Sequence, residues 1–286
     1  MARLFTDEAH RVQTSILQTA SIVMTGNAVL QGWNAGEWWP TASVFTFCDR
    51  VVFIEGTTGL FRQPKRFADN PRDFLNTVAA VNGALRLRLD SRTGESEDRG
   101  TAGFAGGGSR WLIEVVSPGS SDLWEAEWTF RERNRAKGGW AVEYHRVTAI
   151  PLMVALTARD SDAFDREVHD TLTGIAGFAR SQNLDNFAAI FERALAAFEA
   201  RSATRPAHAI DLAPQGFLDQ EALRLLDVAQ AAWVFGGMGS WNDVGWFEDS
   251  AVAEAYEAWS ARLFAALQQA VLIAANSTYA VASGRA

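Results

Sequence analysis

The stretches WEAEWTFR (124–131) and WAVEYHRVT (140–148) decide the fold of this chain. In each stretch, apolar and polar residues alternate with a period of two. This is the pattern of a β-strand with one face in the core and the other in water. The connection ERNRAKGG (132–139) is short, so we expect the two strands to pair as an antiparallel hairpin.

Further strands are expected on both sides of this hairpin. ALRLRLD (84–90) alternates strictly, and WLIEVV (111–116) is a short apolar run. ASVFTF (42–47) and RVVFIEG (50–56) flank Cys48 and predict a second, tight hairpin. IPLMVALT (150–157) is more continuously apolar, which is typical of a more buried strand.

Helical periodicity marks the start of the chain and its second half. We expect a helix over 6–24, ended by Gly26 and Asn27, and a short helix over 71–82 that opens on a proline. From about residue 159 onward, apolar stripes at helical spacing predict four more helices, the third over 219–235 and the fourth from Asp249 or Ser250.

This order of elements indicates an α+β fold, with an antiparallel sheet in the N-terminal half followed by a helical C-terminal half. We divide the chain into a sheet region with the N-terminal helix, 1–157, and a helical region, 158–286. The two regions form either one continuous domain or two domains.

Composition narrows the class of protein. The chain has 286 residues, a net charge of -8 and a pI of about 5.1, which argues against general nucleic-acid binding. The N-terminus lacks the apolar core of a signal peptide, and the most apolar run, FAALQQAVLIAA (264–275), is too short to span a bilayer. With its arginine and alanine bias and a single cysteine, the chain is expected to be a soluble, cytoplasmic bacterial protein.

A glycine-rich, charged segment, SRTGESEDRGTAGFAGGGSR (91–110), joins two of the expected strands. A structureless connection of this length is uncommon inside a compact domain. Its composition predicts either a disordered hairpin loop or a lid.

The first candidate site lies on the polar face of the expected hairpin. There, Glu125 and Glu127 are expected to lie near Glu143 and His145, because cross-strand neighbours have β-carbons about 5 Å apart. Three carboxylates and an imidazole suit proton transfer or a divalent cation. The alternative is a solvated face whose glutamates are neutralised by arginines, among which Arg86 and Arg88 are candidates.

The second candidate site is the loop within WVFGGMGSWNDVGWFEDS (233–250), which combines glycines with large aromatic side chains. Tryptophan is enriched in binding hot spots, so the loop is a candidate surface for a partner or ligand. The alternative is that its aromatic rings fold back as a plug between the two flanking helices. The residues of this candidate surface are Trp241, Asn242, Asp243, Trp246 and Phe247, with Trp38 and Trp39 as possible additions.

Two function classes follow from these sites. The first is a non-catalytic binding or protein-interaction module that uses the loop and pairs with another protein or with a second copy of itself. The second is a hydrolase-like enzyme, with or without a metal ion, that uses Glu125, Glu127, Glu143 and His145. The chain contains no sequence motif for a metal site, a cofactor or a catalytic nucleophile, so we expect no cofactor.

Overall fold

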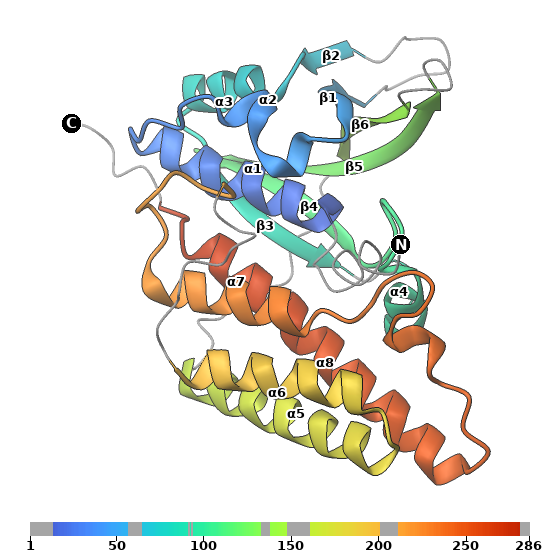
Figure 1. The fold of residues 1–286 in the computed structure, drawn as a ribbon. Helices are drawn as coiled ribbons and strands as arrows, with labels where there is room; N and C mark the ends of the chain where they lie inside the picture. Colours follow the sequence, from blue (N-terminus) through green and yellow to red (C-terminus); the bar gives the residue numbers. More distant parts are fainter. Residues whose placement is uncertain are drawn as a thin grey trace.

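A computed structural model describes residues 14–56, 65–90, 92, 94–132, 138–147, 161–200 and 211–280 (Figure 1). The helices are α1 (Thr14–Leu30), α2 (Trp38–Thr41), α3 (Pro71–Ala80), α4 (Glu95–Thr101), α5 (Ser161–Ser181), α6 (Asp185–Glu199), α7 (Gln220–Ala232) and α8 (Ser250–Asn276), with 3₁₀ turns η1 (Ser43–Phe45) and η2 (Trp241–Asp243). The strands are β1 (Cys48–Glu55), β2 (Lys65–Ala68), β3 (Ala84–Asp90), β4 (Arg110–Ser117), β5 (Ser120–Glu132) and β6 (Gly138–Val147).

The expected α+β class is confirmed, with six strands in the order β2-β1-β6-β5-β4-β3. β5 and β6 form the expected antiparallel hairpin, in which Ala126 lies opposite Tyr144 and Trp128 opposite Val142. The expectation of a purely antiparallel sheet is wrong, because β1 runs parallel to β6. Alternation along one strand specifies which side chains are buried, but it carries no information about the direction of the neighbouring strand.

The expected hairpin around Cys48 does not form. Residues 43–45 make a 3₁₀ turn, and β1 pairs instead with β2 on one side and with β6 on the other. Val44 and Phe45 are both buried, so their burial is achieved in a turn rather than on one face of a strand. The strand expected over 150–157 lies outside the described residues.

Helix α1 is buried on all sides, from Ser15 to Ala28. It does not end at Gly26 and Asn27 as expected, but continues to Leu30. Gly26 serves close packing instead, because a Cβ there would lie 2.7 Å from Leu75 Cδ2. The expected helix over residues 6–24 therefore holds for its second half, while residues 1–13 lie outside the described residues.

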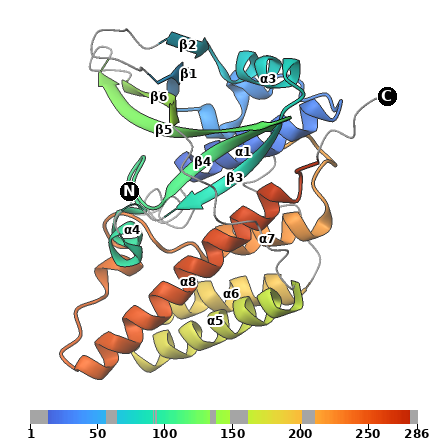
Figure 2. The ribbon, with the colours of Figure 1, turned by 180° about the vertical axis from the view of Figure 1, so that it is seen from behind.

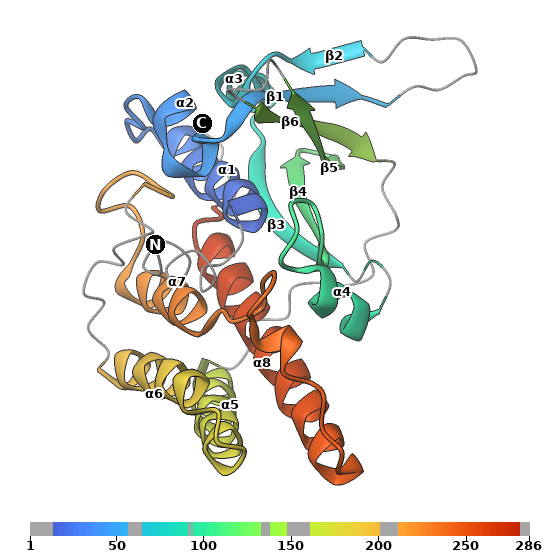
Figure 3. The same cartoon turned by 45° about the vertical axis from the view of Figure 1, so that its right-hand side comes forward.

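Helices α1 and α3 cover the same face of the sheet (Figure 3). α3 opens on Pro71, as its sequence predicts, and the Asn70 side chain accepts a hydrogen bond from the Asp73 amide. Under these helices, Phe53 of β1 stacks on Phe74 of α3 at 3.8 Å between ring centroids. Among the described elements, none of the helices packs on the opposite face of β1, β6 and β5.

The C-terminal helices form a second layer, in which α8 runs beside α5 and α7 and reaches the edge strand β3 (Figure 2). One connected cluster of buried apolar side chains contains residues from both this layer and the sheet region. Among the described residues, α8 is the one helix long and apolar enough for a membrane span. However, 61% of its most apolar window is buried within the protein, which argues against a span.

Two asparagines close the outer edge of β3. The Asn27 side chain donates to the Leu85 carbonyl at 2.8 Å and accepts from its amide at 2.9 Å. Asn276, at the end of α8, makes the same pair of hydrogen bonds with Leu87. These side-chain amides take the place of a neighbouring strand, so the edge groups of β3 at these positions are satisfied.

Candidate functional site

The structure brings the four residues of the first candidate site together. The sequence predicts that these residues lie near one another, and on the hairpin Glu125 lies opposite His145 and Glu127 opposite Glu143. His145 Nε2 is 3.5 Å from a Glu127 carboxylate oxygen and 3.7 Å from one of Glu143. Their neighbours on this face come from β4 and β1, because those strands flank the hairpin.

Two of these three carboxylates are paired with arginines. Glu125 accepts hydrogen bonds from Arg110 at 2.7 and 3.1 Å and contacts Arg92 at 3.2 Å. Glu143 is paired with Arg50. Glu127 is exposed and has His145 as its neighbour. The expected role of Arg86 and Arg88 is not observed, because β3 lies next to β4, and Arg88 binds Glu114 at 2.6 Å instead.

This arrangement favours an ion-paired sheet face over a catalytic one. A carboxylate held by a guanidinium has its oxygens occupied and is poorly placed to accept a proton or bind a metal ion. In the part of the chain that the structure describes, no three His, Cys, Asp or Glu side chains are placed to hold one metal ion. Glu125 and Glu143 are held by arginines in this way, which leaves Glu127 with His145 as the acid–base pair that the geometry offers the enzyme hypothesis.

In the second candidate site, Trp241 points inward. It is fully buried, and its indole Nε1 donates a hydrogen bond to Ser260 Oγ of α8 at 2.7 Å. Its ring packs edge-on against Phe187 and Phe191 of α6 and stacks on Tyr256 at 5.2 Å between ring centroids. Trp241 is thus a core residue that anchors the loop, and it offers no surface to a partner.

The neighbours of Trp241 also hold the loop in place. Phe247 is partly buried against Phe178 and Tyr256. The Asn242 side chain donates to the Arg99 carbonyl at 3.2 Å, and the Asp243 carboxylate accepts from the Gly239 amide. Of the five residues of the predicted surface, these four therefore have structural contacts within the protein.

Trp246 is different, because its side chain is 92% exposed between the anchored residues Trp241 and Phe247. Met238, earlier in the same loop, is 98% exposed. An exposed apolar side chain is ordinary when it stands alone. Two large exposed apolar side chains on one loop, which buried rings hold in place, are unusual. A tryptophan is ordinarily mostly buried, and in this chain Trp246 is not.

Helix α4 and the residues after it lie against the same loop. Most of the segment 91–110 is described, and the expectation of a disordered loop is wrong for that part, because α4 packs against α8 through a buried Arg99 paired with Glu257. Gly103 lies directly on the loop, since a Cβ there would be 2.7 Å from Gly236 Cα. The next residue, Phe104, is 62% exposed.

The charged residues of the segment 234–261 have one sign. Residues 234–261 contain five acidic residues and no lysine, arginine or histidine. Asp243 and Glu248 are exposed beside Trp246 in the sequence, and Glu254 is exposed on the first turns of α8. We call Phe104, Met238, Asp243, Trp246 and Glu248 the loop surface; it combines large apolar side chains with negative charge.

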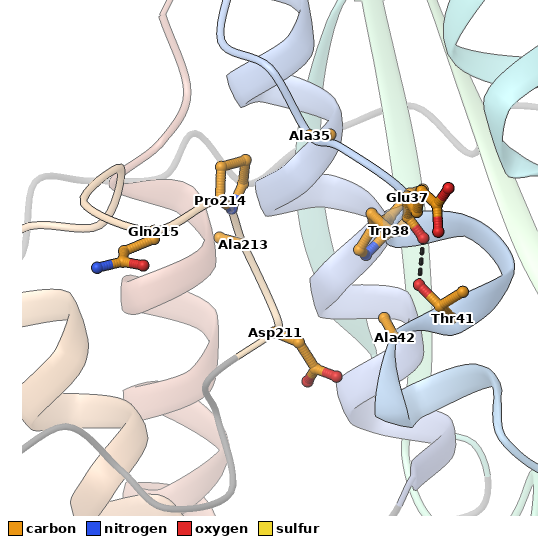
Figure 4. A pocket seen from close by; sticks show the side chains of 9 residues that line it. All are labelled: Ala35, Glu37, Trp38, Thr41, Ala42, Asp211, Ala213, Pro214 and Gln215. Atoms are coloured by element: carbon orange, nitrogen blue, oxygen red, sulfur yellow. Dashed lines mark hydrogen bonds between the residues drawn. The ribbon is translucent and has the colours of Figure 1, made fainter.

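A separate shallow pocket of about 290 Å³ lies between the α1–α2 connection and residues 211–215 (Figure 4). Asp211 lines the pocket, and its carboxylate accepts hydrogen bonds from the backbone amide and the hydroxyl of Ser43, at 2.5 and 2.7 Å. Trp38, which lines it, is buried and donates from Nε1 to Ser21 Oγ at 3.0 Å. Asp211 and Trp38 therefore serve the fold, and Glu37 and Gln215 are further polar side chains of the pocket lining.

Sequence reasoning found Trp246 but missed Met238 and Phe104. Met238 carries no polar signal, and Phe104 joins the loop only through the contact of Gly103 with Gly236. The absence of basic residues over 234–261 was the available sequence signal for the charge of this surface.

No protein-family model, curated protein or solved structure matches this chain.

Proposed function

We propose that this protein is a non-catalytic interaction module and that the loop surface contacts its partner. The observation that carries the proposal is Trp246, a large aromatic side chain held in solvent by a loop whose neighbouring rings are buried. Tryptophan is among the residues that contribute most to binding when a partner desolvates them. A rigid loop also loses little conformational entropy on binding.

The buried anchors support the same function. Trp241, Phe247 and the Asn242–Arg99 hydrogen bond fix the loop on α8 and α4. Three sets of polar or aromatic contacts therefore hold in place a segment that exposes Trp246. On the sheet face, by contrast, Glu125 and Glu143 are held by arginines, which makes these two carboxylates poor acid–base groups.

The proposal is tested by placing a photo-crosslinking amino acid at Trp246 and irradiating the full chain in a lysate of its own cells. The matched control carries the same amino acid at Phe130, an exposed aromatic residue on β5. We expect a partner crosslinked from position 246 and not from position 130.

A second variant separates binding from folding. Trp246→Ala removes an exposed side chain, so the melting temperature is expected to stay within about 1 °C of the parent, whereas partner affinity falls about tenfold or more. Equal crosslinking from both positions, or full affinity in folded Trp246→Ala, contradicts the proposal.

A further inference from the structure

Resting on this proposed function, we infer that the loop surface recognises a basic segment of another protein, in which arginine or lysine side chains flank a large apolar residue. Trp246, Met238 and Phe104 supply apolar contact area, being 92%, 98% and 62% exposed. The charge that surrounds them is negative, with exposed Asp243 and Glu248 in the loop and Glu254 on α8.

The acidic side chains here are less neutralised than those of the sheet face. Over 234–261 the sequence has no lysine, arginine or histidine, so positive charge must come from other segments. Of the arginines on the adjoining helices, Arg99 of α4 is buried and paired with Glu257, and Arg262, farther along α8, lies over the Trp259 ring at 4.9 Å from its centroid. Complementary charge steers association and selects the partner, so a cationic segment fits this surface best.

The same charge argues against other occupants. Nucleic acid and anionic membranes present negative charge and would be repelled. A symmetric dimer through the loop surface would place Asp243 and Glu248 of one copy near the same residues of the other, because a twofold interface pairs a surface with itself. The inference therefore commits to a different protein as the partner.

The test uses three short fluorescein-labelled peptides and the full chain. One peptide has arginines flanking a leucine-rich centre, and in the other two the arginines are replaced by glutamine or by glutamate. Fluorescence anisotropy gives the dissociation constants at low and at physiological salt. We expect the arginine peptide to bind about tenfold more tightly than the glutamine peptide, with a preference that weakens as salt screens exposed charges.

Variants locate the binding. Trp246→Ala is expected to raise the dissociation constant of the arginine peptide about tenfold. The double variant Glu248→Gln with Glu254→Gln is expected to raise it about fivefold. The matched control, Glu37→Gln with Glu127→Gln, removes the same charge from exposed positions elsewhere and is expected to leave binding unchanged. Sedimentation velocity of the full chain is expected to show a monomer.

Three results overturn the inference: equal binding of all three peptides or of none, equal loss in the control pair, or a dimer that Trp246→Ala dissociates. If a partner is crosslinked from position 246 and any of these results is also obtained, the proposed function stands. Only the inference that the partner offers a basic segment is then abandoned. If no partner is crosslinked from position 246 but the arginine peptide still binds and depends on Trp246, the preference for a basic segment stands and the lysate test of the proposed function has failed.

Discussion

Asp227 on α7 is a single residue that works against the fold at neutral pH. Burial alone raises the pKa of Asp227 from 3.8 to about 6. The folded protein thus holds this proton more tightly than the unfolded chain, so the stability contributed by protonated Asp227 is lost as pH rises from about 4 to above 6. We expect Asp227→Asn to raise the melting temperature at pH 7.5 by a few degrees, with a gain that shrinks below pH 6 and vanishes near pH 4. Glu254→Gln removes the same charge from an exposed position and serves as control; an equal gain at every pH speaks against the burial effect.

At the scale of elements, the side-chain amides that close the edge of β3 have a measurable role. Asn27→Asp and Asn276→Asp keep the acceptor for the strand amide but lose the donor to the strand carbonyl. We expect Asn276→Asp to lower the free energy of unfolding by about 1–3 kcal/mol. Asn27 is fully buried, so Asn27→Asp is expected to cost more, about 3–5 kcal/mol.

Urea denaturation followed by circular dichroism measures both changes. Asn76→Asp, at an exposed position of α3, is the matched control and is expected to stay within about 0.5 kcal/mol of the parent. If Asn27→Asp behaves like this control, the asparagines do not hold the edge of the sheet.

At the scale of the whole molecule, the question is whether the sheet region and the helical region unfold together. One connected apolar cluster includes Leu85 of β3, Met24 of α1 and Leu272 of α8. Since the contacts of α8 with α1 and β3 join the two layers, we expect a single calorimetric transition with coincident far- and near-ultraviolet circular dichroism. Two resolved transitions, the first losing only helical signal, would instead support two domains divided near residue 158.

The sequence by itself determined the elements whose periodicity is long and regular. The β5–β6 hairpin and the grouping of Glu125, Glu127, Glu143 and His145 follow from alternation and a short connection. So do α3 and the C-terminal helices, because each needs only one buried face and recognisable end signals. At the candidate site, the sequence singled out the aromatic loop, with Trp246 as one of five residues of the predicted surface.

Only the tertiary structure decided the relations between distant segments. The parallel pairing of β1 with β6, the role of Gly26 in packing and the pairing of Glu125 with Arg110 all depend on which segment lies alongside. The loop makes the same point most sharply. Trp241 and Trp246 are alike in sequence, yet one is buried against α6 and α8 and the other is exposed. A residue's identity gives the free energy available from burial, whereas the surrounding fold decides whether that burial occurs within the chain or is left for a partner.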